Sequence, residues 1–120
     1  MIQKQTVLTV ADNSGVKKTQ CIHIYNKKIV AKIGDKILTT IKQGRSKNAL
    51  SKGDLVSAII VRVRSHHRTQ SNNYLVFNDN SVVLVNKQGQ PLGTRLFGPI
   101  PVTFRNKKKF KIMSLGAILI

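Results

Sequence analysis

Acidic residues are scarce in this chain: four aspartates and no glutamate stand against 21 lysines and arginines in 120 residues. Pairing every aspartate would still leave a net charge of +17. A compact domain of this length has a radius of gyration of roughly 14 Å, so these cations lie within one or two Debye lengths of one another and repel. We therefore expect the counter-charge to come from a partner, and nucleic acid is the first candidate.

Cysteine and long apolar runs are also scarce. The single cysteine, Cys21, excludes an internal disulfide. The longest apolar runs have four or five residues, against the roughly 20 that a membrane-spanning helix needs. The N-terminus shows neither a secretory apolar region nor an Arg- and Ser-rich import peptide. We expect no membrane segment and, for a protein that works in an organelle, synthesis inside that organelle.

Apolar residues make up 41% of the chain and are spread along it, so it can fold, as one domain over residues 1–120. Gly and Pro recur between short segments rich in Ile, Val and Thr, which is typical of all-β proteins. The expected strands are 6–10, 20–25, 29–32, 36–41, 54–64, 74–77 and 82–85. This spacing favours a small closed β-barrel or a sandwich. Residues 112–120 are expected to form a short terminal helix.

The segment 54–64 changes its pattern along its length. Its first half is apolar on both faces, whereas one face of its second half carries cations. We expect this strand to begin buried on both sides and to leave the barrel as a protruding β-ribbon. The return strand is 74–77, and 69–73 form the polar tip. The side chains expected to point from the ribbon toward a partner are Arg62, Arg64, His66, His67 and Arg68.

The sequence contains no evident catalytic or metal-binding group. Its acids are Asp12, Asp35, Asp54 and Asp79. Each neighbours Gly or Asn, where a short carboxylate accepts backbone N–H bonds in turns. Cys21 and His23 would share a strand face, but a closed zinc site needs about four ligands. The phosphate-loop, nucleophile-elbow and dinucleotide-binding motifs are absent. We expect no enzyme, no cofactor and no metal site.

Three clusters of basic residues are the candidate binding sites. They are a glycine-containing loop at 42–52, whose backbone can approach phosphates closely, the ribbon, and the segment 105–111. Together they indicate contact with a nucleic-acid backbone at several points. The six aromatic residues are too few for a base-stacking platform, so folded RNA fits better than single strands. The predicted RNA contacts are Lys17, Lys18, Lys42, Arg45, Lys47, Lys52, Arg62, Arg64, His66, His67, Arg68, Arg105, Lys107, Lys108 and Lys109.

An ordered set of motifs resembles the ribosomal protein L14 family of the large ribosomal subunit. The motifs are MIQ at 1–3, VADNSG at 10–15, CI at 21–22, GD at 34–35, KGD at 52–54, AIIVR at 58–62, FNDN at 77–80, GTRLFGP at 93–99 and KIMSL at 111–115. Each motif is moderately specific, but the ordered set covers essentially the whole chain at the usual length of the family.

This resemblance implies a small closed β-barrel with a protruding ribbon and short helical turns near the C-terminus. It also implies a structural, non-enzymatic role at the face of the large subunit that meets the small subunit. Members of the family bind large-subunit rRNA, bridge to small-subunit rRNA, and pack against ribosomal proteins such as L3 and L19. Some present the region matching Thr94, Arg95 and Lys111 to a silencing factor that blocks subunit joining. Phe97 is expected in the same interface.

The chain departs from the family pattern in places. Asn72 stands where Gly is usual, which is tolerable because Asn accepts left-handed conformations. Residues 101–104 replace a polar segment, and Gly116 replaces an alanine. The 13 Ile, 9 Asn and 15 Lys are typical of AT-rich coding sequence and indicate a mitochondrially encoded copy, with a plastid or a bacterium as alternatives. The alternative function is a free-standing OB-like RNA-binding module or RNA chaperone. A small nuclease ranks last because it needs converging acids.

Overall fold

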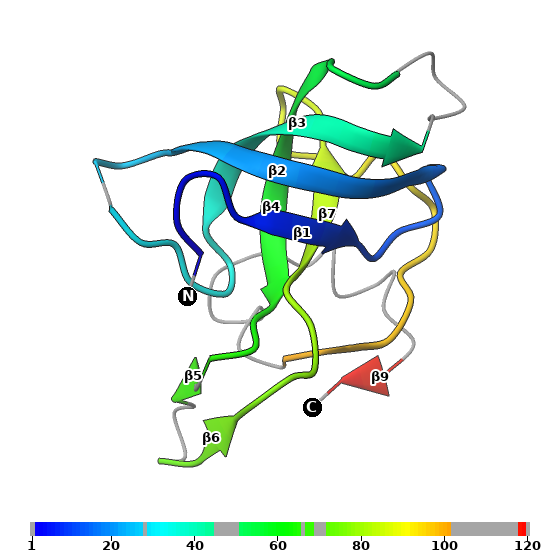
Figure 1. The fold of residues 1–120 in the computed structure, drawn as a ribbon. Helices are drawn as coiled ribbons and strands as arrows, with labels where there is room; N and C mark the ends of the chain where they lie inside the picture. Colours follow the sequence, from blue (N-terminus) through cyan, green and yellow to red (C-terminus); the bar gives the residue numbers. More distant parts are fainter. Residues whose placement is uncertain are drawn as a thin grey trace.

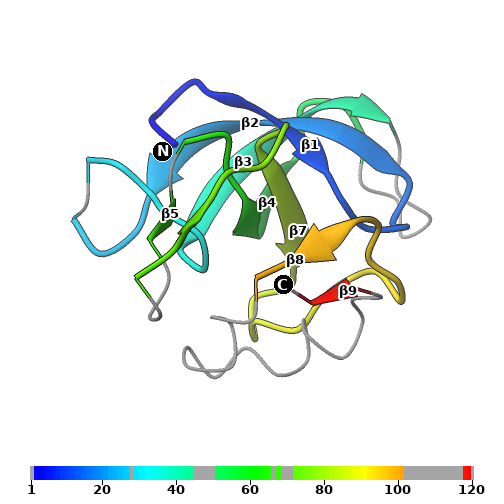
Figure 2. The same ribbon diagram turned by 90° about the horizontal axis from the view of Figure 1, so that it is seen from below.

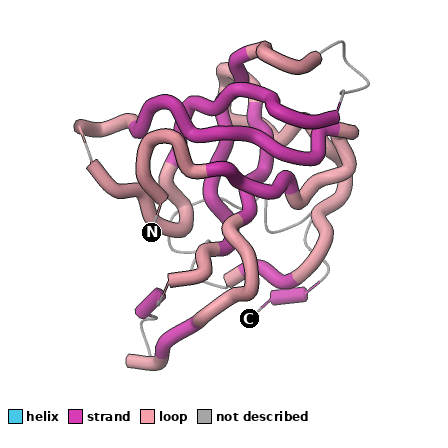
Figure 3. Tube along the Cα trace, in the orientation of Figure 1, coloured by secondary structure: helices cyan, strands magenta, loops and turns pink. Residues whose placement is uncertain are grey.

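The computed structural model describes residues 2–27, 29–44, 51–65, 67–68, 72–101 and 118–119. Within these ranges the regular secondary structure is entirely β-strand (Figure 3). Five strands form a closed barrel in the order β1-β2-β3-β4-β7 (Figure 1). Their bounds are β1 (Val7–Val10), β2 (Val16–Ile24), β3 (Lys36–Gly44), β4 (Leu55–Arg62) and β7 (Ser81–Val85). The predicted all-β barrel is confirmed.

The barrel is closed by one parallel pair, β1 with β7, while its other neighbouring strands are antiparallel. In β1, Leu8 and Val10 point into the core and the alternate residues are exposed, as the two-residue period of a strand requires. All of β7 is buried. The chain also returns along one edge of β7, where the Leu92 N–H donates to the Leu84 carbonyl at 3.0 Å.

A register shift in β2 separates two residues that were expected to lie together. The pairing of β2 with β3 shifts between Cys21 and His23. Such a bulge lets two neighbouring residues face the same side of the sheet, and Ile22 and His23 are both exposed whereas Cys21 is buried. The prediction that Cys21 and His23 share a strand face is therefore wrong.

Two of the strands predicted in the first third of the chain differ from the structure. β2 begins at Val16 rather than at residue 20. The predicted strand 29–32 does not form in the described residues. Ala31 instead makes an isolated bridge with Ile2, in which their N–H and carbonyl groups bond at 2.9 and 2.7 Å.

The burial of β4 runs in the direction opposite to that predicted. Leu55 at its start is 60% exposed, whereas the residues from Ala58 to Val63 are buried. The far end is covered because the segment that includes Pro99 lies over it, as the hydrogen bonds from Arg62 described below show. β4 therefore begins at the surface and ends inside the protein.

The predicted ribbon is confirmed. β5 (His67–Arg68) and β6 (Tyr74–Leu75) pair antiparallel as a separate two-stranded sheet. They project from the lower left of the barrel in Figure 1. The return strand is shorter than the predicted 74–77. Asn72 beside it has φ +67°, the left-handed conformation expected to be tolerated at this position.

Near the C-terminus, β8 (Pro99–Ile100) pairs in parallel with β9 (Ile118–Leu119). Figure 2 shows the two strands side by side. The predicted terminal helix is thus wrong at 118–119, and residues 112–117 lie outside the described ranges. No helix in the described part of the chain is long and apolar enough to cross a membrane.

Candidate nucleic-acid interface

Four of the predicted RNA-contact lysines gather at one end of the barrel, where β2 begins and β3 ends. These two strand ends are paired. The turn that contains Lys52 is attached to β3, because the Gly53 N–H donates to the Ile41 carbonyl at 2.9 Å. All four side chains are exposed. We call this surface the lysine end, and it consists of Lys17, Lys18, Lys42 and Lys52.

A bulge at the start of β2 directs two neighbouring lysines outward. The register with β3 shifts on both sides of Lys18, so Lys17 and Lys18 are both exposed. Gly44, with φ +96°, lies against this bulge, and a Cβ on it would come within 2.6 Å of the Lys17 nitrogen and 2.7 Å of the Gly15 oxygen. The absence of a side chain at Gly44 therefore permits the close approach of β2, and the approach of a phosphate to the backbone of this loop stays a prediction.

The ribbon carries two further exposed cations, Arg64 and Arg68. The Arg64 backbone N–H donates to Asn80 Oδ1 at 2.8 Å, which attaches the base of the ribbon to the chain before β7. The Arg68 guanidinium donates to Asn72 Oδ1 from Nε at 3.0 Å and also from Nη2. We call Arg64 and Arg68 the ribbon surface.

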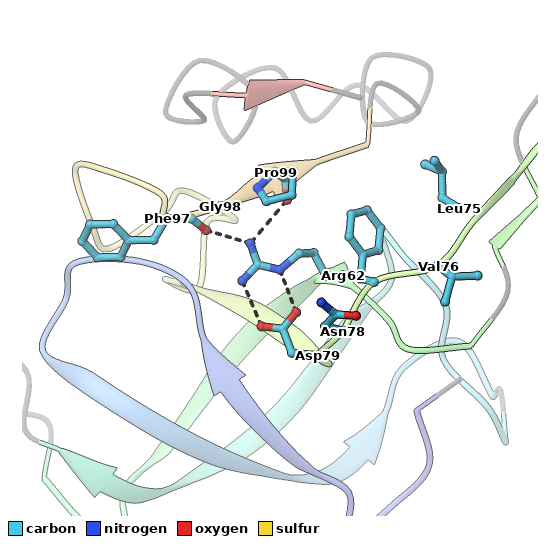
Figure 4. A pocket seen from close by; sticks show the side chains of 9 residues that line it. Arg62, Leu75, Val76, Asn78, Asp79, Phe97, Gly98 and Pro99 are labelled. Atoms are coloured by element: carbon cyan, nitrogen blue, oxygen red, sulfur yellow. Dashed lines mark hydrogen bonds and ion pairs between the residues drawn. The ribbon is translucent and has the colours of Figure 1, made fainter.

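Arg62 is not part of the ribbon surface, and the prediction that it projects toward RNA is wrong. The residue is only 7% exposed, and each of its five N–H donors is used. Figure 4 shows the bonds to Asp79, Phe97 and Pro99. Nε and Nη2 donate to the Asp79 carboxylate at 3.0 and 3.2 Å, and Nη2 also donates to Ser81 Oγ at 2.9 Å. Nη1 donates to the carbonyls of Phe97 and Pro99 at 2.7 and 3.3 Å. Arg62 therefore joins separate segments of the chain.

A hollow of about 580 Å³ opens beside this arginine (Figure 4). Its lining includes Leu75, Val76, Phe77 and Phe97 together with Arg62 and Asp79. The two titratable groups named here are paired with each other.

Thr94, Arg95 and Phe97 are exposed residues of one loop, which is held by backbone hydrogen bonds to Ala11 and Asn13 and by the Asn13 side chain. Asn13 Oδ1 accepts the N–H groups of Thr94 and Arg95 at 2.8 and 3.1 Å, and Asn13 Nδ2 donates to Thr94 Oγ1 at 2.9 Å. The Arg95 guanidinium lies 5.6 Å from the centre of the Phe97 ring, within cation–π range. We call these three residues the 94–97 loop. The sequence shows Asn13 within the motif at 10–15, but its bonds to this distant loop were not predicted, although Asn in a turn is a known acceptor of backbone N–H bonds.

Three aspartates have the predicted turn role. Asp12, Asp35 and Asp54 accept backbone N–H bonds from residues two or three positions away, at 3.1, 2.8 and 2.8 Å. Asp12 is buried and also accepts the Leu84 N–H at 3.2 Å, so it links the first turn to β7. Asp79 differs from the prediction because it pairs with Arg62. In the described ranges no three His, Cys, Asp or Glu side chains lie together as metal ligands.

The remaining predicted contacts stay predictions. His67 lies in β5. The others fall outside the described residues, and they are Arg45, Lys47, His66, Arg105, Lys107, Lys108, Lys109 and Lys111.

One protein family matches this sequence over its whole length. The family is described as "Ribosomal protein L14p/L23e", and its sequence model covers residues 1–120. The match therefore includes the barrel, the ribbon and the 94–97 loop.

Proposed function

Because the chain belongs to the ribosomal protein L14p/L23e family, we propose that it binds large-subunit rRNA through two basic surfaces of one barrel. Members of this family are structural constituents of the ribosome and not enzymes. The two surfaces are the lysine end and the ribbon surface. In Figure 1 the first lies at the upper right, where β2 begins, and the second projects at the lower left. The protein measures 41 Å along its longest axis, so the two surfaces suit separate rRNA segments.

The observation that carries this proposal is that the lysine end is exposed and, within the described ranges, forms no ion pair. Three aspartates bond to backbone N–H groups, and Asp79 pairs with the buried Arg62. Among the described residues no carboxylate pairs with a member of the lysine end. Phosphates would supply the missing charge, and each neutralised phosphate releases condensed counterions, which favours binding at low salt. The barrel thus holds cations in fixed positions for an external polyanion.

The 94–97 loop is the surface that we assign to the subunit interface. It is exposed, its backbone is fixed by Asn13, and it combines a cation with an aromatic ring. These properties suit a bridge to small-subunit rRNA or contact with a silencing factor that blocks subunit joining. Ribosomal proteins resembling L3 and L19 are the proposed neighbours.

We assign the protein to the mitochondrial ribosome, with synthesis inside the organelle. The support is the composition, since Ile, Asn and Lys together account for 37 residues. Sedimentation of a tagged copy in organelle lysate tests the assignment. We expect a stoichiometric copy in the large-subunit peak. A substoichiometric copy would indicate a free-standing RNA-binding module. Recovery of the protein in ribosomes of a plastid or of bacterial cytoplasm would show that the mitochondrial assignment is wrong.

The electrostatic mechanism is tested by the salt dependence of binding to the cognate rRNA fragment. Six to ten phosphate contacts would lower the affinity roughly 10³- to 10⁵-fold between 50 and 200 mM salt. The double variant Lys17→Gln/Lys18→Gln should reduce the slope of log affinity against log salt by about two. Lys87→Gln, an exposed lysine outside the lysine end, is the control and should leave the slope unchanged. Equal slopes for the wild type and the double variant would refute the role of the lysine end.

A further inference from the structure

A second hollow differs in character from the basic surfaces. It is an apolar groove of about 540 Å³ between β3, β4, β7 and the turn at 86–92. Its lining includes Tyr25, Leu38, Leu55, Val85 and Leu92, and Lys87 is its charged member. We call this surface the apolar groove. In a chain with a net charge of +17, a site lined mainly by leucines, valines and a tyrosine is not built for phosphates.

Leu55 gives the strongest sign that the apolar groove is covered in the assembled particle. Its segment is apolar on both faces, a pattern typical of a strand buried on both sides. The protein itself leaves this residue 60% exposed. Leaving a large apolar side chain in water forgoes the stabilisation that burial would give. Leu55 shares the apolar groove with the half-buried side chains of Leu38 and Leu92.

Cations lie beside the apolar groove and lack acidic partners within the described residues. Lys36 Nζ lies 5.7 Å from the centre of the Tyr25 ring, and Lys87 is exposed. Within the described ranges an ion pair joins Arg62 to Asp79, and none involves Lys36 or Lys87. An apolar floor with cations beside it is complementary to an apolar side chain next to an acidic one. A phosphate backbone would leave the apolar side chains of the groove in contact with water, because phosphates have no apolar surface to cover them.

The closed barrel limits how a partner can bind here. β3 and β4 each have a hydrogen-bonded neighbour on both sides, so they offer no free edge to an added strand. The partner must insert side chains. We propose that the apolar groove docks a segment of a neighbouring ribosomal protein, with an apolar side chain against Leu55 and Leu92 and an acidic side chain toward Lys36 and Lys87. This inference rests on the ribosomal function proposed above.

Site-specific photo-crosslinking in purified large subunits tests the proposal. The photoreactive residue p-benzoylphenylalanine replaces Leu55, and in the matched control it replaces Val7, which is 54% exposed on β1 and does not line the apolar groove. We expect position 55 to crosslink to one ribosomal-protein peptide in which an apolar residue lies close to Asp or Glu, and position 7 not to reach that peptide. Crosslinks from position 55 to rRNA, or to no neighbour, would overturn the proposal. Absence of the unmodified chain from the large subunit would instead refute the ribosomal function itself.

A charge substitution provides an independent readout. Leu55→Glu should weaken retention of the crosslinked neighbour in salt-washed subunits roughly tenfold, whereas Val7→Glu should not. Because both residues are exposed, the thermal unfolding of the isolated protein should match the wild type in both variants. Equal retention of the neighbour by the two variants would overturn the proposal.

Discussion

The guanidinium of Arg62 forms an ion pair with Asp79 in which Nε lies 3.0 Å from Oδ1. The same guanidinium donates to the carbonyls of Phe97 and Pro99. Arg62 ends β4, Asp79 lies between the ribbon and β7, and the two carbonyls belong to the segment that leads into β8. One buried side chain therefore fixes the segment that presents the 94–97 loop against the end of the barrel.

We predict that Arg62→Met destabilises the fold whereas Arg64→Met does not. The first variant leaves two carbonyls without the Arg62 donor and leaves the Asp79 carboxylate with the Ser81 hydroxyl as its remaining side-chain donor. This loss should lower the free energy of unfolding by about 2–3 kcal/mol. Arg64 is exposed, so its substitution should change stability by less than about 0.5 kcal/mol while weakening rRNA binding. Urea unfolding and rRNA titration of both variants distinguish these effects. If the Arg62→Met protein kept wild-type stability and lost rRNA affinity, Arg62 would be an RNA contact after all and the structural role would be refuted.

Gly98 provides a second test of the same contacts. It has φ +83°, and a Cβ on it would overlap Nη1 of Arg62. Gly89 has nearly the same conformation, φ +82°, with no atom near the position of its Cβ. Gly89→Ala should therefore cost only the backbone strain, about 1–2 kcal/mol, and Gly98→Ala should cost clearly more. Equal losses in urea unfolding would show that the Arg62 guanidinium moves aside without cost.

Local patterns predicted the barrel, the ribbon and the turn role of three aspartates. Alternation of apolar residues and punctuation by Gly and Pro depend on neighbours in sequence, so they are readable without the fold. The exposure of Arg62 and of Leu55 was predicted wrongly, because it depends on segments that are distant in the sequence. The residues around Pro99 cover Arg62, while the start of β4 lacks such a cover. No periodicity within 54–64 contains that information.

The bulges of β2 explain the errors on that strand. An extra residue shifts the two-residue period, so alternation counted from the sequence assigns later side chains to the wrong face. Cys21 and His23 were separated in this way. The other bulge, at Lys17 and Lys18, lies against Gly44 of β3. Because Gly44 is on a different strand, the local sequence around the lysines does not show this contact.

Gly44→Ala should disturb the lysine end as well as the fold. Its added Cβ would meet the backbone of Lys17 and Gly15, which cannot move aside as a flexible side chain can. Gly53 is the matched control, because it has φ +92° against +96° and no atom near its Cβ position. We expect Gly44→Ala to lower both the stability and the salt slope of rRNA binding, and Gly53→Ala to cost about 1–2 kcal/mol of stability with the slope unchanged. Indistinguishable slopes for the two variants would show that the lysine end does not depend on the bulge.

Cys21 should make the stability depend on pH in the alkaline range. Burial raises the pKa of the Cys21 thiol, and this outweighs the lowering effects of the His23 backbone and of Lys4. The unfolded thiol ionises near its ordinary pKa of roughly 8.5, whereas the folded thiol keeps its proton to higher pH. Its contribution to stability is therefore fully present below that value and is lost as the pH rises toward the folded pKa. We expect the difference in free energy of unfolding between the wild type and Cys21→Ala to shrink from pH 7 to about pH 10. Because both proteins carry the same lysines and tyrosines, their shared titration largely cancels in this difference, and a constant difference would show that the thiol titrates alike in both states.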